Sequence, residues 1–208
     1  MFITLEGPDG SGKTTQAHLL VEWLEERDYP VVLTREPGGT DIGDQIRAVL
    51  HDPENAAMDP RTEILLYSAD RAQHVAQVIR PALTEGKIVI SDRYADSTIA
   101  YQGYGRQLDL EMLRTLTLFA TGGLTPDLTI YFDILPEEGL QRRLQNKEEW
   151  NRLDGETLAF HRRVRAGYLE MIRQDPARWT TIDAARSVDT VKGDVQERVR
   201  RAIRAEAI

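Results

Sequence analysis

The feature that most constrains this chain is a glycine-rich segment that lies between a short apolar run and a helical pattern. Residues 7–14 read GPDGSGKT and match the pattern G-x-x-x-x-G-K-[ST]. Glycines at this spacing let successive backbone N–H groups face one anion, and the helix that follows adds its positive N-terminal end. Because the segment follows the apolar run at residues 2–5 and opens a helical pattern, the sequence predicts a loop that binds the phosphates of ATP or GTP.

Individual residues of this loop have expected tasks. Lys13, which we expect to be exposed, should reach the β- and γ-phosphates, and the Thr14 hydroxyl should bind Mg²⁺. Asp92, at the end of a later apolar run, is a second candidate Mg²⁺ ligand, acting through water. The residues predicted to hold the ATP phosphates are Gly7, Asp9, Gly10, Ser11, Gly12, Lys13, Thr14 and Thr15.

Apolar runs alternate with helical patterns along the rest of the chain, and several of the runs lack polar alternation, as is typical of strands buried on both faces. The predicted strands are residues 2–5, 31–34, 87–91, 127–133 and 179–182. The predicted helices include residues 13–27, 60–83, 155–174 and 187–205. This alternation predicts an α/β fold with a parallel sheet and helices on both faces. The length of 208 residues fits a single domain.

Composition and charge argue against several classes of protein. The formal net charge of −8 argues against a general nucleic-acid-binding protein. No run of about 18 apolar residues is present, so no membrane span is predicted, and the N-terminus lacks the pattern of a secretory signal. The sequence contains no cysteine, which fits the reducing cytoplasm as the predicted location.

A GTPase would need N-K-x-D after a late strand to read guanine. The nearest match, at residues 146–149, ends in glutamate and follows a helical pattern, so we interpret it as surface charge.

The acceptor is indicated by arginines near the ends of the predicted elements. Arg35 follows the second predicted strand, Arg93 follows the third, and Arg71 lies on the helical pattern between them. Carboxyl ends of parallel strands meet at one edge of a sheet, where α/β proteins bind ligands. Because a guanidinium matches a phosphate bidentately and keeps its charge, the set predicts an acceptor that already carries phosphate.

Four segments taken together carry a resemblance to a known family. They are the loop at residues 7–15, TREPGGT at 34–40, DRY at 92–94 with Ser97 and the Tyr101-Gln102 pair, and PDLT at 126–129. In the same order and over nearly the whole chain, they resemble the thymidylate kinases of the bacterial kind. The resemblance implies a P-loop nucleoside monophosphate kinase fold with a five-stranded parallel sheet, working as a homodimer. It also implies ATP with Mg²⁺ as the phosphate donor and dTMP as the acceptor.

The resemblance further implies roles for single residues. Asp9 would touch the sugar and the acceptor phosphate, and Arg93 would hold that phosphate. Tyr67 would stack on thymine while Arg71 bonds its edge, and Tyr101 would crowd the sugar in favour of the deoxy form. The Glu36-Pro37 bond would be cis. The residues implied to bind dTMP are Asp9, Glu36, Pro37, Tyr67, Arg71, Arg93, Ser97, Thr98, Tyr101 and Gln102.

One departure concerns the charge on the transferring phosphoryl group. Some relatives carry an arginine where this loop has Gly10. The bacterial kind supplies the arginine from a mobile lid, which the resemblance places at about residues 142–154. Arg152 is the candidate, with Arg142 and Arg143 as alternatives, and Asp154 is expected to cap the helix that follows. The predicted catalytic residues are therefore Lys13, Arg93 and Arg152.

Two other readings of the same residues stay open. One is a different small-molecule P-loop kinase, such as a deoxynucleoside kinase, against which the arginine set argues. The other is a catalytically silent nucleotide-binding module, against which Lys13, Thr14 and Asp9 argue.

Overall fold

A computed structural model of the chain describes residues 1–145 and 151–206. Within these ranges, parallel strands form a five-stranded sheet in the order β2-β3-β1-β4-β5. The strands are β1 (Phe2–Glu6), β2 (Val31–Arg35), β3 (Ile88–Asp92), β4 (Leu128–Asp133) and β5 (Trp179–Asp183). The predicted parallel α/β fold is confirmed, and each predicted strand coincides closely with an observed one.

Helical segments connect the strands. They are α1 (Lys13–Glu25), α2 (Asp41–His51), α3 (Pro60–His74), α4 (Arg80–Thr84), α5 (Ala95–Thr98), α6 (Leu110–Thr121), α7 (Pro136–Gln145), α8 (Leu158–Gln174) and α9 (Val188–Glu206), with the shorter turns η1 (Pro53–Asn55), η2 (Val75–Ile79) and η3 (Ile99–Gly105). The helix predicted over residues 60–83 is confirmed as one continuous helical segment from Pro60 to Thr84, with an irregular turn inside it. This irregular turn is the wide π-type η2, just before Pro81, which has no N–H to donate to the preceding turn.

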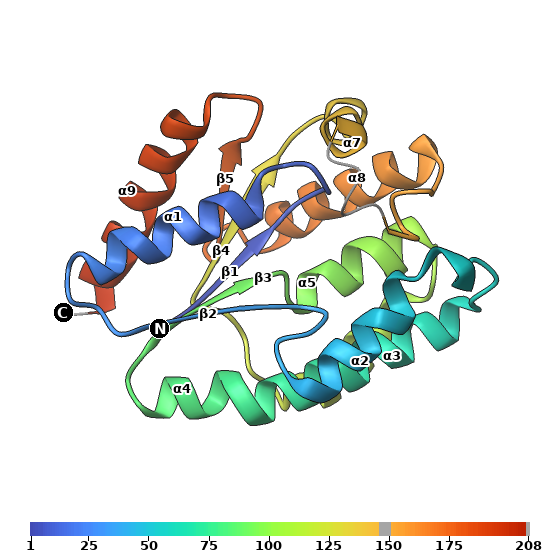
Figure 1. Cartoon of the computed structure of the whole chain (residues 1–208), viewed down its shortest axis with the longest axis horizontal. Helices are drawn as coiled ribbons and strands as arrows, with labels where there is room; N and C mark the ends of the chain where they lie inside the picture. The colour runs from blue at the N-terminus through green and yellow to red at the C-terminus, as the bar shows by residue number, and fades with distance from the viewer. Residues whose placement is uncertain (146–150, 207–208) are drawn as a thin grey trace.

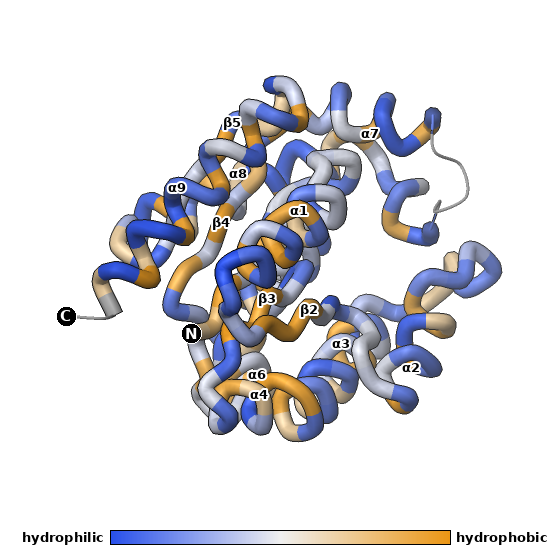
Figure 2. The backbone as a smooth tube through the Cα atoms, turned by 60° about the vertical axis from the view of Figure 1, so that its left-hand side comes forward, coloured by the Kyte–Doolittle hydropathy of each residue, from blue (hydrophilic) through white to orange (hydrophobic). Residues whose placement is uncertain are grey.

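Helices cover both faces of the sheet (Figure 1). On one face α1 and α9 pack together, and their Leu20, Leu24 and Val195 bury the inward side chains of β1 and β4. On the other face, side chains of α3, η3, α6 and α8 form a second apolar cluster. Hydrophilic and hydrophobic residues alternate along α9, as expected of a helix with one face on the sheet (Figure 2).

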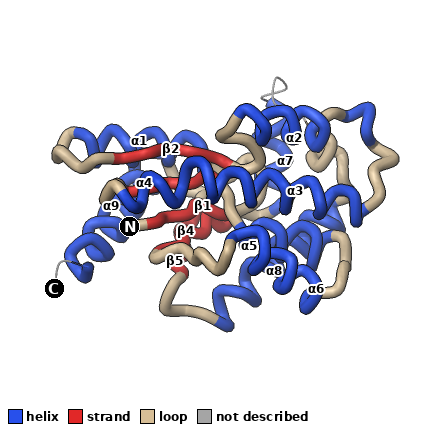
Figure 3. Tube along the Cα trace, turned by 90° about the horizontal axis from the view of Figure 1, so that it is seen from below, coloured by secondary structure: helices blue, strands red, loops and turns tan. Residues whose placement is uncertain are grey.

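The strands all run toward one side of the molecule. Helices α2, α3, α5 and α7 gather on that side, beyond the carboxyl ends of the strands (Figure 3). Among the described residues, no helix combines the length and apolar character needed to cross a bilayer.

Candidate active site

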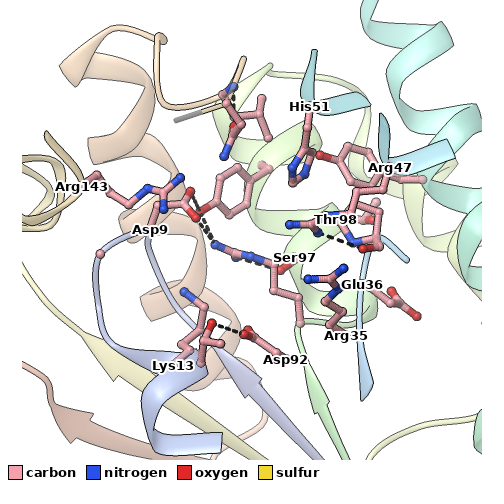
Figure 4. Close-up of a pocket in the computed structure, with 18 of the residues that line it drawn as sticks. Asp9, Lys13, Arg35, Glu36, Arg47, His51, Asp92, Ser97, Thr98 and Arg143 are labelled. Carbon is pink, nitrogen blue, oxygen red and sulfur yellow. Dashed lines mark hydrogen bonds and ion pairs between the residues drawn. The ribbon is translucent and has the colours of Figure 1, made fainter. Parts of the chain in front are cut away.

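A cavity of about 730 Å³ lies at the carboxyl ends of the strands (Figure 4). Its walls come from the loop after β1, the loop after β2, helices α2 and α3, the segment from β3 to η3, and helix α7. Most of the residues predicted to bind phosphate or dTMP line it. Gly7 and Ser11 belong to the loop but are not among its lining residues.

The loop after β1 adopts a backbone that requires glycine at Gly10. Its φ of +76° lies in the left-handed region, and a Cβ at this position would stand 2.1 Å from the carbonyl oxygen of Gly139 in α7. An arginine cannot occupy position 10 unless α7 moves away. The absence of the loop arginine therefore has a steric cause in this chain.

Lys13 is buried rather than exposed, which corrects the sequence expectation. Its side chain folds back along the loop, and Nζ donates to the carbonyl oxygens of Gly7 at 3.0 Å and Pro8 at 2.7 Å. Burial and the nearby Arg93 lower the pKa of Lys13 to about 8. The ammonium is thus held at the phosphate loop by weak neutral partners, which a phosphate would replace.

Thr14 and Asp92 meet at the floor of the cavity. The Thr14 hydroxyl donates to Asp92 Oδ2 at 2.6 Å (Figure 4). Oxygen ligands of this kind suit Mg²⁺, which commonly takes one or two protein oxygens and completes its shell with water and phosphate. The two side chains therefore fit the predicted metal.

Arg93 joins the phosphate loop to the acceptor side. Its backbone is in the left-handed region at φ 72°, an unusual state for a side-chain-bearing residue and one that clusters at functional sites. Nη2 donates to Asp9 Oδ1 at 2.8 Å and to the Tyr101 hydroxyl, which itself donates to Asp9 Oδ2 at 3.0 Å. Burial acts to raise the pKa of Asp9, but Arg93, Lys13 and Arg143 lower it below its ordinary value, so the carboxylate stays ionised.

Glu6, at the end of β1, supports this cluster from below. One oxygen accepts from the backbone N–H of Tyr94, and the other accepts from Ser97 Oγ at 2.6 Å and the Tyr168 hydroxyl at 2.8 Å. Burial and the charge of Asp96 raise the pKa of Glu6 to about 7. Ser97 in turn accepts from Arg93 Nη1, so Glu6 helps to fix the arginine.

The opposite end of the cavity has an aromatic and a guanidinium side by side on α3. Tyr67 and Arg71 are one helical turn apart, and both line the cavity. Arg71 Nε donates to Glu36 Oε2 at 2.7 Å, Nη1 to Thr98 Oγ1 at 2.8 Å and Nη2 to the Tyr94 carbonyl at 3.0 Å. The Glu36-Pro37 bond is cis, as the resemblance implied. A guanidinium has five N–H donors, and these three bonds use three of them.

Arg152 is the predicted catalytic residue that the structure does not bring to the cavity. Its side chain is 5% exposed, and it donates to Glu63 Oε2 and to the Leu50 carbonyl. Arg142 and Arg143 line the cavity in its place. Much of the predicted lid, residues 146–150, lies outside the described residues.

Asp154 does not cap the next helix, so that expectation was wrong. Helix α8 begins at Leu158 and is capped by Thr157, whereas Asp154 is buried against Arg143 at 2.6 Å. The Asp154 carboxylate is engaged by Arg143 and does not cap a helix.

Four cavity residues were missed by the sequence analysis. They are Arg47, His51, Asn151 and Leu153. The first two lie on α2, which begins at the cap residue Thr40. The spacing of Ile42, Ile46 and Leu50 carries the signal of an amphipathic helix and could have located it.

Comparisons with known proteins converge on one family. A family model described as thymidylate kinase matches residues 5–195. The thymidylate kinase of Roseiflexus castenholzii is 54% identical over an alignment of 203 residues that covers 92% of this chain and 89% of that protein. That of Nitratidesulfovibrio vulgaris is 52% identical over 213 residues, covering 100% of this chain and 99% of its own. The crystal structure of thymidylate kinase from Ehrlichia chaffeensis superimposes with a TM-score of 0.78 at 37% identity, covering 96% of this chain and 98% of that one.

Proposed function

Since this chain belongs to the thymidylate kinase family, an enzyme family that phosphorylates dTMP to dTDP with ATP, we propose that the cavity at the carboxyl ends of the strands is where its transfer takes place. The observation that carries the proposal is the meeting of two half-sites in one cavity. Lys13 and its loop lie at one end, Tyr67 and Arg71 lie at the other, and Arg93 stands between them.

The transfer itself needs alignment and charge neutralisation more than covalent chemistry. Lys13 leaves its carbonyl partners to bind the β- and γ-phosphates of ATP. Arg93 binds the phosphate of dTMP, and Asp9 holds the guanidinium in place. The acceptor is a phosphate oxygen that is already ionised, so neither Asp9 nor Asp92 has to act as a general base.

Thr14 and Asp92 would hold Mg²⁺. When bound, the metal would neutralise charge on the β- and γ-phosphates. The contribution of the chain is to present both oxygens at the floor of the cavity, next to Lys13.

Tyr67 stacks on the thymine ring, and Arg71 and Gln102 bond its edge. Thr98 and Glu36 orient Arg71 through the hydrogen bonds described above. Tyr101, which is 4% exposed and fixed between Asp9 and Arg93, crowds the 2′ position of the sugar.

Arg143 takes the role that the sequence analysis gave to Arg152. It lies in the last turn of α7, lines the cavity and acts electrostatically on Asp9. It would add positive charge near the transferring phosphoryl group. Arg152 instead anchors the C-terminal end of the lid segment to α3 through Glu63.

The working form is a homodimer in the cytoplasm. Three successive neighbours, α2, α3 and α6, leave apolar side chains exposed, which supports a second copy as the partner. We call this set the apolar face: Ile42, Val49, Leu65, Met112, Leu118 and Phe119. The absence of cysteine supports a reducing compartment.

A substrate panel tests the proposal. ADP release is measured with thymidine, dTMP, dUMP, dCMP and dGMP, in the wild type and in Lys13→Ala. We expect release with dTMP far above that with thymidine, and loss of the signal in Lys13→Ala. Equal rates with thymidine would favour the deoxynucleoside kinase alternative, and no release with any acceptor would favour the silent module.

A further inference from the structure

Behind the base pocket lies a buried carboxylate, Glu63, whose role so far is only to anchor Arg152. Glu63 is in the first turn of α3, and its side chain is 1% exposed. It precedes Tyr67 by one helical turn and Arg71 by two, so the three side chains share a face of the helix. Glu63 does not line the cavity, but it bonds to Gln102, which does.

The Glu63 carboxylate is ionised and held in a fixed orientation. Arg106 donates to both oxygens, from Nε to Oε1 at 3.2 Å and from Nη2 to Oε2 at 3.0 Å. Arg152 donates a further hydrogen bond to Oε2. Burial acts to raise the pKa of Glu63, but the hydrogen bonds from Arg106 and Gln102 lower it below its ordinary value. A bidentate arginine pair of this kind restrains both partners geometrically.

An ionised carboxylate can only accept hydrogen bonds, and this decides the orientation of Gln102. The nitrogen of the Gln102 amide stands 2.8 Å from Glu63 Oε1. The oxygen of the same amide could not take that place, because two acceptors would then face each other. The carbonyl oxygen of Gln102 is therefore directed away from Glu63, and no donor in the described part of the chain bonds to it.

The pocket thus presents a fixed pattern along the edge of the base. Gln102 offers an acceptor and Arg71 offers donors. Thymine has a matching edge, since N3 carries a hydrogen and position 4 is a carbonyl. A pyrimidine with an amino group at position 4 has the opposite pattern: its N3 accepts a hydrogen bond and its exocyclic nitrogen donates one. From this geometry we infer that Glu63 is a specificity-determining positioning residue, which selects 4-oxo over 4-amino pyrimidines by holding the Gln102 amide in one orientation.

This inference rests on the base-pocket role proposed for Gln102, and the test separates the two. The substrates are dTMP and 5-methyl-dCMP, which differ only at positions 3 and 4 of the ring. The measured quantity is the ratio of kcat/KM for dTMP to that for 5-methyl-dCMP. Any effect on the lid through Arg152 acts on both substrates alike and cancels in this ratio.

Glu63→Gln should lower the ratio about tenfold or more, because a glutamine can donate as well as accept and so permits the Gln102 amide to flip. Glu63→Asp keeps an acceptor-only group and should retain most of the preference. The matched control is Glu156→Gln, which also removes a carboxylate from Arg106 but does not touch Gln102, and it should leave the ratio near the wild-type value. A wild-type ratio in Glu63→Gln would overturn the inference.

Gln102→Met distinguishes a failure of the base-pocket role proposed for Gln102 from a failure of the inference about Glu63. If it leaves the ratio unchanged, the proposed role of Gln102 is wrong. If it lowers the ratio while Glu63→Gln does not, only the inference about Glu63 fails. If Glu63→Gln does not fold, NMR of the wild type tests the inference instead. The side-chain amide signal of Gln102 is assigned as the one that disappears in Gln102→Met. The amide protons should be protected from exchange with and without dTMP, and rapid exchange in the free protein would contradict the inference.

Discussion

At the scale of single residues, Lys13 ties the affinity for ATP to pH. Burial and Arg93 lower its pKa to about 8 in the free protein, and only the ammonium form attracts phosphate. Above pH 8 the neutral Lys13 amine must take up a proton when Mg-ATP binds. The Kd for Mg-ATP should therefore rise by about tenfold per pH unit. Calorimetric titrations between pH 7 and 9.5 measure this slope.

The control for Lys13 is Lys13→Arg. A guanidinium keeps its charge throughout this range, so the Kd of the variant should stay nearly level whatever its absolute value. A level profile in the wild type as well would show that Lys13 does not titrate near pH 8.

Glu6 should make the stability of the fold depend on pH. Its carboxyl has a pKa of about 7 in the folded protein against 4.5 ordinarily, so folding favours the protonated form. The stabilisation is complete below about pH 4.5 and is lost as the pH rises through 7. The free energy of unfolding should therefore fall by at most about 3 kcal/mol over this window on account of Glu6.

Urea denaturation of the wild type and Glu6→Gln at pH 5 and pH 8 isolates this effect, because other titrating groups contribute equally to both proteins. The amide can still accept from Tyr94 and bond to Ser97, so the variant should fold. We expect Glu6→Gln to gain stability relative to the wild type between pH 5 and pH 8. A difference that does not change with pH would assign Glu6 an ordinary pKa.

At the scale of elements, the sequence analysis located every strand but not every helix. The strands are buried on both faces, so their apolar runs are nearly continuous, and the phosphate loop has a spacing that few other structures share. Helices α2 and α6 were not predicted: the apolar spacing on α2 was overlooked, and α6 leaves Leu118 and Phe119 exposed. Site residues that follow strands were therefore named, and those on α2 were missed.

The partners of Arg152 could not have been predicted, because they depend on tertiary contacts between distant segments. The chain around residues 151–154 is held by Glu63 on α3 and by Arg143 on α7, and neither pairing has a local sequence signal. The family resemblance suggested which segment belongs to the lid. It could not say which arginine of that segment faces the cavity.

Arg143→Ala and Arg152→Ala should differ in their effect on kcat, although each removes the partner of a buried carboxylate. Arg143 lines the cavity, so its removal should lower kcat by about 10²-fold or more with little change in KM for dTMP. Arg152 is buried against Glu63, so its removal should mainly lower the free energy of unfolding, by about 1–3 kcal/mol. Steady-state kinetics and urea denaturation measure the two effects. The exposed Arg162, changed to alanine, is the control. The opposite pattern would restore Arg152 as the catalytic arginine.

At the scale of the whole molecule, the apolar face on α2, α3 and α6 predicts how the chain associates. Phe119 is the most exposed of its residues, at 84%. A second copy seated on this face would bury it, and an aspartate there would have to be desolvated without a partner. Phe119→Asp should therefore shift the chain from dimer to monomer in analytical ultracentrifugation. Val188→Asp, at a 54% exposed residue that begins α9 outside this face, should leave the dimer intact. Dissociation by both variants, or by neither, would place the contact between copies elsewhere.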